Sequence, residues 1–136
     1  PAAARTMVAR LQAGRRWIWV AGNHDPGPTD LGGTHLAEAA IGPLTFRHIA
    51  APGATAEISG HYHPKARLST AAGRVARKAF LIDGDRAILP AYGTYTGGLS
   101  CDDPALAALM RPDAIAVLTG RRALAVPMRP RRTARA

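Results

Sequence analysis

Cysteine is almost absent from this chain of 136 residues, whose single thiol is Cys101. One cysteine excludes an internal disulfide and a thiolate metal cluster within one chain, so imidazole, amide and carboxylate groups must supply any metal ligands. No apolar run approaches the ~18 residues that cross a bilayer, and the first residues lack the charged-then-apolar order of a secretory signal. We therefore expect a cytoplasmic protein with no membrane partner.

Acidic residues are also scarce, because 9 Asp and Glu stand against 18 Lys and Arg, which gives a formal net charge of +9 at pH 7. This excess favours acidic partners such as nucleic acid only weakly, since many basic proteins bind nothing specific. Arginines crowd the C-terminal stretch, where Pro127 and Pro130 interrupt regular structure. We expect one domain over residues 1–126 and a basic, disordered tail over 127–136, which either attracts phosphate or merely keeps the protein soluble.

Apolar spacing predicts a mixture of helices and strands. Apolar residues at positions 4, 7, 8 and 11 recur at the spacing of one helical face, which predicts a helix that ends before Gly14. Asp103 before Pro104 predicts an N-cap and a helix to about residue 110. Short apolar runs that are typical of strands lie at 17–20, 44–49, 57–59, 75–82, 87–89, 115–118 and 123–126. The turn residues 83–85 predict a hairpin. Residues 29–41 lack a clear period, and we expect a loop there with a short helix around 36–40. Together these elements predict a layered α/β architecture.

The phrase Gly22-Asn23-His24-Asp25 directly follows an apolar run. Amide oxygen and neutral imidazole are good ligands for borderline divalent metals. Because Asn23 and His24 are adjacent, a sharp turn would let one bind a metal ion while the other donates to a phosphoryl oxygen. Asp25 would then hold the His24 ring in its productive tautomer. Taken alone, the phrase is as consistent with a simple turn.

The phrase Gly60-His61-Tyr62-His63 follows a second apolar run. Strand alternation would place His61 and His63 on the same side, where both rings could reach a common ion. The alternative is a pair of exposed loop histidines. His48, near the end of the run at 44–49, could supply one more nitrogen, although a single strand histidine is more often structural.

In this order, Gly-Asn-His-Asp and Gly-His-x-His resemble the calcineurin-like metallophosphoesterases. Residues 17–20, 42–48, 60–67 and 90–99 are similar to the bacterial ligase-associated DNA damage response endonuclease branch, the PdeM type. The resemblance implies a metallophosphoesterase-type β-sandwich flanked by helices, and two-metal hydrolysis of phosphate esters with manganese, zinc or iron. It also implies a DNA repair setting, with DNA as a substrate and functional association with DNA ligase, helicase and exonuclease.

The resemblance assigns a role to each matching residue. The implied ligands of the second metal ion are Asn23, His48 and His61, and the implied ligand of the first is His63. The implied catalytic residues are His24, which assists the leaving group, and Asp25, which orients it.

The family pattern also has Asp-x-His and Gly-Asp phrases upstream of the first motif, and neither occurs before Gly22. Gly84-Asp85 has the right letters but lies in the expected hairpin. We therefore expect an N-terminally incomplete copy of the enzyme that lacks its first strands and helices. Such a chain should have reduced or no activity and an exposed sheet edge that promotes aggregation.

Two alternatives belong to other functional classes. One is a non-catalytic nucleic-acid-binding module, whose phosphate contacts would be the arginine tail with Lys65, Arg67, Arg74, Arg77 and Lys78. Steep salt dependence without a metal requirement would favour it. The other is a purely structural remnant, which would show neither hydrolysis nor binding.

Overall fold

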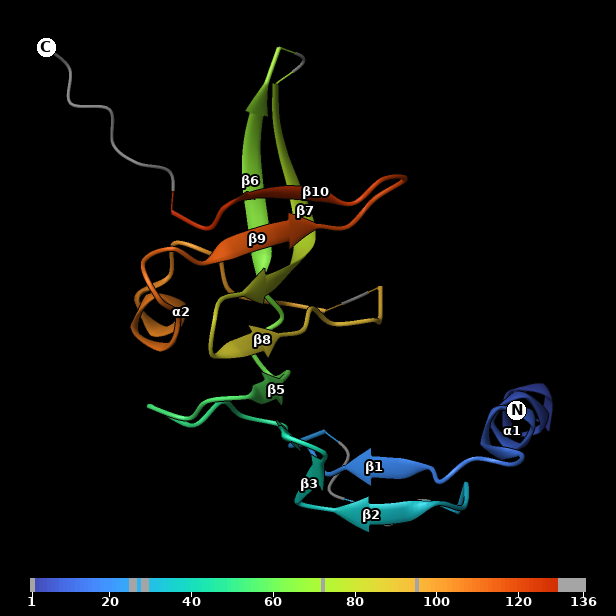
Figure 1. The fold of residues 1–136 in the computed structure, drawn as a ribbon. Helices are drawn as coiled ribbons and strands as arrows, with labels where there is room; N and C mark the ends of the chain where they lie inside the picture. Colours follow the sequence, from blue (N-terminus) through green and yellow to red (C-terminus); the bar gives the residue numbers. More distant parts are fainter. Residues whose placement is uncertain (1, 25–26, 28–29, 72, 95, 130–136) are drawn as a thin grey trace, which may run out of the picture.

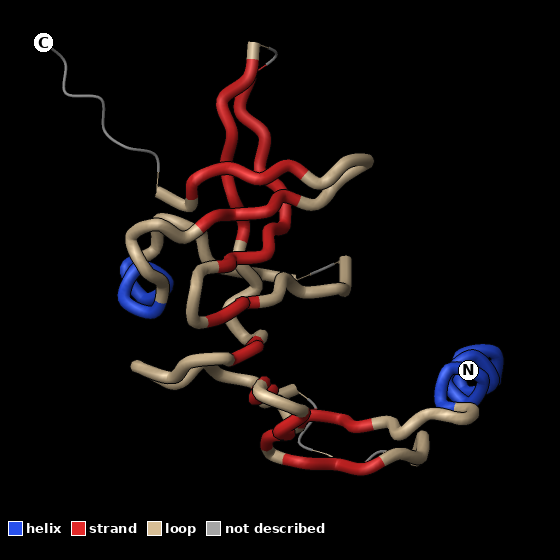
Figure 2. Tube along the Cα trace, in the orientation of Figure 1, coloured by secondary structure: helices blue, strands red, loops and turns tan. Residues whose placement is uncertain are grey.

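The structure is a computed structural model that describes residues 2–24, 27, 30–71, 73–94 and 96–129. These residues form a mixed α/β fold in which strands dominate and helices are few (Figure 2). In chain order the elements are α1 (Ala2–Gln12), β1 (Ile18–Val20), β2 (Thr34–Leu36), β3 (Glu38–Ile41), β4 (Leu44–Arg47), β5 (Glu57–Ser59), β6 (Lys65–Thr70), β7 (Gly73–Ile82), β8 (Arg86–Ile88), α2 (Pro104–Leu109), β9 (Ile115–Leu118) and β10 (Leu124–Pro127). The expected α/β class is confirmed in this coarse form.

Most strands join one sheet in the order β10-β9-β7-β8-β5-β4-β3, while β1 and β2 form a separate parallel pair. β7 is long enough to pair twice. Its first part, from Gly73 to Lys78, pairs with β6, and its last part, from Ala79 to Ile82, pairs with β9. β6 and the first part of β7 therefore project from the sheet as a two-stranded ribbon (Figure 1).

The buried core lies where β7, β8 and β9 meet α2. Leu81 and Ile88 from the sheet and Leu106 from the helix are fully buried there. The helix begins as the sequence predicts, because the Asp103 carboxylate accepts a hydrogen bond from the backbone N–H of Ala105 at 2.9 Å and proline follows at the first position. Burying each such leucine or isoleucine stabilises the fold by about 1.5–3 kcal/mol.

The opening helix is attached differently. None of the described residues 2–12 that form α1 is buried. The helix is held by an ion pair between Arg5 and Asp30 and by a 2.8 Å hydrogen bond from Gln12 Nε2 to the carbonyl of Leu31. Figure 2 shows that α1 and α2 lie far apart on opposite sides of the strands.

Two local predictions are wrong. In place of the expected helix around 36–40, β2 ends at Leu36 and residues 38–41 form β3, because pairing with β1 and β4 outweighs the helix propensity of alanine. The sequence does not predict β6, because Pro64 indicates the end of the strand that precedes it. Proline lacks only its N–H, and it is tolerated just before a strand, where its carbonyl accepts from Ala79 at 3.0 Å.

The expected tail boundary at residue 127 is also wrong. Pro127 ends β10 opposite Ile115, and Met128 is 4% exposed within the core cluster. Arg129 Nη2 donates to the carbonyl of Met110 at 3.0 Å. Apolar burial and pairing therefore hold residues 127–129 in the fold, and residues 130–136 lie outside the described part of the chain. No helix among the described residues is long and apolar enough to cross a membrane.

Candidate metal centre

Parallel pairing of β4 with β5 brings two of the predicted histidines together. Arg47, the last residue of β4, is in register with Ser59, the last residue of β5. The chain therefore leaves both strands at the same edge of the sheet. The residues that follow stay paired there, because the backbone N–H of Gly60 donates to the carbonyl of His48 at 3.0 Å.

Three potential metal-binding atoms meet at this edge. His48 Nε2 lies 2.5 Å from Asn23 Oδ1 and 3.1 Å from His61 Nδ1. The two imidazole rings meet edge to face, with centroids 4.9 Å apart and planes at 76°. His48 is thus the central member of a cluster that we call the Asn23–His48–His61 cluster.

Asn23 reaches the cluster because the chain passes very close to His48 after β1. A Cβ atom at Gly22 would lie 2.9 Å from His48 Nδ1, which is closer than real Cβ atoms approach other heavy atoms. Any side chain at position 22 would push the imidazole away. The glycine that opens the first motif is therefore required by the close approach of backbone and ring.

The second motif is positioned by a tight bend, so the prediction from strand alternation is wrong. β5 ends at Ser59, and His61 and His63 have φ angles of 64° and 47°. These are left-handed conformations, which cost a non-glycine residue about 1–3 kcal/mol each and concentrate at functional sites. His61 joins the cluster, whereas none of the hydrogen bonds between described residues joins His63 to it.

His63 nevertheless lies near the cluster. Burial lowers the pKa of His63 below its ordinary value, and the positive charges of His24 and His61 lower it further. Its backbone is packed against Gly98, where a Cβ atom would lie 2.1 Å from the carbonyl oxygen of His63. Gly98 was not among the predicted site residues, and only its place in a glycine-rich stretch hints at this role.

The two predicted catalytic residues, His24 and Asp25, follow Asn23 in the first motif. His24 is exposed and follows Asn23 directly, so the adjacent side chains are available for different tasks. Asp25 lies outside the described residues.

The donor set of the cluster suits a divalent cation. Two ligand atoms at right angles around an ion, each bonded at about 2.1 Å, lie about 3 Å apart. The two imidazole nitrogens match this spacing at 3.1 Å, whereas Asn23 Oδ1 and His48 Nε2, at 2.5 Å, would have to move slightly apart to bind one ion. All three atoms can offer a lone pair, and nitrogen with amide oxygen suits manganese, iron or zinc. Among the described residues, no group of three His, Cys, Asp or Glu side chains could hold a metal ion. The third member of the cluster is the Asn23 amide.

A buried ion-pair network supports the strands that deliver the histidines. Glu57, at the start of β5, is 1% exposed, and its carboxylate lies 3.3 Å from Arg47 Nε and 3.2 Å from Arg86 Nη1. It also accepts from the backbone N–H of Ala51 at 2.9 Å. This carboxylate thus ties β4, β5 and β8 together below the cluster. Sequence reasoning missed it, because a single glutamate in a strand does not reveal two arginine partners that are distant in the chain.

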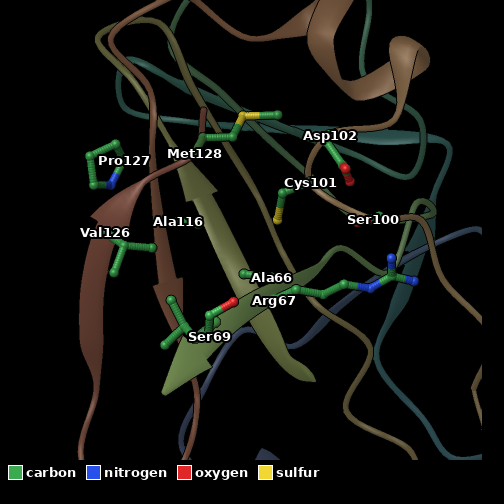
Figure 3. Close-up of a pocket in the computed structure, with 11 residues that line it drawn as sticks. Ala66, Arg67, Ser69, Ser100, Cys101, Asp102, Ala116, Val126, Pro127 and Met128 are labelled. Carbon is green, nitrogen blue, oxygen red and sulfur yellow. The ribbon is translucent and has the colours of Figure 1, made fainter. Parts of the chain in front are cut away.

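A separate cavity of about 420 Å³ lies away from the cluster, against β6, β9 and β10 (Figure 3). Its lining is mostly apolar, with Arg67 and Asp102 among its polar residues. Burial and the negative charge of Asp102 raise the pKa of the Cys101 thiol in this cavity to about 11. None of the predicted site residues lines it.

Comparison with known proteins shows a likeness to a solved structure. No family model matches the chain, and no curated protein matches it. Among solved structures, the chain is similar to the nuclease MPE of Pseudomonas putida, with a TM-score of 0.69 and 26% sequence identity. The match covers 92% of this chain and 60% of that protein, so this chain spans less than two thirds of the nuclease. The likeness supports a nuclease-like fold.

Proposed function

We propose that this chain carries part of the active site of a metal-dependent hydrolase that cleaves phosphate ester bonds in nucleic acid. The observation that carries the proposal is the Asn23–His48–His61 cluster, in which His48 Nε2 lies 2.5 Å from Asn23 Oδ1 and 3.1 Å from His61 Nδ1, with the three residues coming from separate segments. The similarity to a nuclease supports the same class of reaction. The finer assignment, a calcineurin-like phosphoesterase sandwich with a two-metal site, is part of this proposal.

The cluster would hold one divalent ion, and His63 would contribute to a second. When bound, such an ion polarises phosphoryl oxygens and makes water a stronger nucleophile. Neutral imidazole is the form that binds metal. Burial, which lowers the pKa of His63, favours this form of the ring.

His24 would serve the substrate. It is exposed beside Asn23, so its ring can donate a proton to the oxygen of the leaving group while the Asn23 amide remains in the cluster. Positioned proton donors of this kind contribute about 10²–10⁴-fold to rate. Asp25 would fix the tautomer of the His24 ring. We place this activity in cytoplasmic DNA repair, with DNA ligase, helicase and exonuclease as functional partners.

The test is hydrolysis of a generic phosphodiester and of labelled DNA, with manganese and after chelation. We expect cleavage at a reduced rate that requires the metal and falls by a further factor of roughly 10² in His61→Ala and in His24→Ala. His35→Ala is the control, because His35 stacks on Trp19 outside the cluster. Cleavage that persists at the control rate in His61→Ala would contradict the proposal.

A non-catalytic nucleic-acid-binding module is the second candidate. It is favoured by the lysines and arginines of the β6–β7 ribbon, where the sequence has no acidic residue from 65 to 78. Under this alternative, binding would be steeply salt-dependent and unaffected by chelation, and hydrolysis would be absent in all variants.

A further inference from the structure

The β6–β7 ribbon has two unlike faces. Residues directly opposite in an antiparallel pair project to the same side, and so do residues two apart in one strand. Ala66, Leu68, Val75 and Arg77 therefore share one face, on which Ala66 and Leu68 pack in or against the core and Arg77 is exposed. The other face, which we call the basic face, consists of Lys65, Arg67, Ser69, Arg74, Ala76 and Lys78.

The basic face carries four cations and no carboxylate. Arg67 and Arg74 are exposed, and none of the ion pairs between described residues involves a side chain of this face. Asp102 is an acidic group that interacts with this face: its pKa is lowered chiefly by a hydrogen bond with Ser100 and least by the charge of Arg67. Cations held together in this way repel one another unless an anionic partner binds.

The basic face begins beside the candidate metal centre. Lys65 follows His63 by two residues, and Lys78 lies directly opposite Lys65 in the ribbon. Backbone hydrogen bonds continue the connection, since Lys65 N donates to the carbonyl of Leu99 at 2.8 Å and Leu99 N donates to the carbonyl of Tyr62 at 3.0 Å. An anionic chain along this face would therefore arrive at the histidines.

The same two lysines hold a loop that presents an aromatic ring. Lys65 Nζ donates to the carbonyl of Thr96 at 3.1 Å, and Lys78 Nζ donates to the carbonyl of Gly93. Tyr92, which opens this loop, is fully exposed at 105%. A ring that contributes nothing to the core is available to stack on a ligand.

We propose that the basic face binds the phosphate backbone of a nucleic acid and that Tyr92 stacks on one of its bases, so that the strand is led to the Asn23–His48–His61 cluster. The inference rests on the proposed function, because it names the surface that would hold the substrate. Small Ser69 and Ala76 separate the cations of this face, so it lacks the large apolar anchors that bind a lipid surface. A row of cations with an adjacent aromatic ring is typical of nucleic-acid grooves.

The backbone contact is tested by charge reversal at exposed positions. Fluorescence anisotropy would report binding of labelled single-stranded and duplex DNA to Arg67→Glu/Arg74→Glu in EDTA. The matched control is Arg10→Glu/Arg16→Glu, which makes the same charge change near α1, far from the ribbon (Figure 1). We expect the ribbon variant to bind about tenfold more weakly or worse, with a salt slope lower by roughly 1.4–1.8. The control should lose much less DNA affinity than the ribbon variant does.

The stacking contact has its own pair of variants. Tyr92→Ala should weaken binding about fivefold or more, whereas Tyr92→Phe keeps the ring and should bind as the unmodified chain does. Because Tyr92 is fully exposed, neither change should alter the thermal midpoint. Equal affinity of Tyr92→Ala and Tyr92→Phe would overturn this part of the proposal.

These outcomes are separable from those of the hydrolysis test, because binding is measured without metal. Equal weakening of the two charge-reversal variants, or no weakening, would overturn the basic face even if cleavage occurs. Ribbon-specific weakening without any metal-dependent cleavage would support the surface and contradict the proposed enzyme. If circular dichroism shows that the glutamate variant is unfolded, Arg67→Gln/Arg74→Gln gives the decisive comparison, with at least about a fivefold loss expected.

Discussion

The region from β5 to β10 and the region from α1 to residue 50, just beyond β4, are packed in different ways. The whole buried core cluster lies in the first, between Ala66 and Met128. Among the described residues of the second, the buried apolar side chains are only Ala39 and Ala50, while larger ones such as Ile49 are half exposed. A shallow apolar hollow of about 330 Å³ separates β1 from β3 and β4.

The candidate metal centre draws on both regions. Asn23 and His48 come from the loosely packed region, whereas His61 and His63 come from the segment that leads into the core. The well-packed region therefore supplies stability, and the other region supplies donors that depend on attachment to it. A site that spans this junction can be lost through weak attachment even when the core stays folded.

The largest expected effect comes from breaking the network that joins the two regions. Glu57→Gln leaves the nearly buried guanidinium of Arg86 without its charge partner, and we expect a loss of about 3–5 kcal/mol in the free energy of unfolding, measured with urea. The control is Glu38→Gln, which removes the exposed partner of Arg47 at 3.0 Å and should cost less than about 1 kcal/mol. Similar losses in the two variants would show that the buried carboxylate stabilises the fold no more than the exposed one does.

A pair of leucines measures the difference in packing directly. Leu81 in β7 is fully buried, and Leu11 in α1 is 47% exposed. We expect Leu81→Ala to lower the free energy of unfolding by about 3 kcal/mol, because it leaves a cavity in the core. Leu11→Ala should change it by about 0.5 kcal/mol or less. A large loss in Leu11→Ala would mean that α1 is packed far better than its exposure indicates.

The smallest expected effect concerns Cys101, in the well-packed region. Its thiol pKa is raised to about 11 from an ordinary value of 9.0, so the thiolate fraction at pH 8 is about a hundredfold lower in the folded protein than in the unfolded one. Alkylation by iodoacetamide should be slowed accordingly. A raised acid pKa also means that this group's contribution to stability falls as the pH rises from about 9 to about 11. Equal alkylation rates with and without denaturant would contradict the burial of Cys101.

The sequence predicted elements whose signal is local. The hairpin at 83–85, the capped helix after Asp103 and the strand at 57–59 depend on turn residues, a cap and a short apolar run, and all three are present. The strands at 34–41 were missed because a glycine- and alanine-rich segment has no period. Their structure is decided by partners elsewhere in the chain.

The site shows the same division. Asn23, His48 and His61 could be named from their motifs, but the bend that carries His61 and His63 reverses the argument from alternation. The roles of Gly98 and Glu57 come from contacts between segments that are distant in sequence. Such contacts leave no periodic pattern in the chain.

Calorimetric titration with manganese measures whether Asn23, His48 and His61 converge on one divalent ion, as we propose. His48 is the decisive position, because its Nε2 atom contacts both other donors. We expect one ion bound to this cluster, with unchanged affinity in His35→Ala and at least about tenfold weaker binding in His48→Ala. Equal manganese affinity in His48→Ala and the unmodified chain would contradict this expectation.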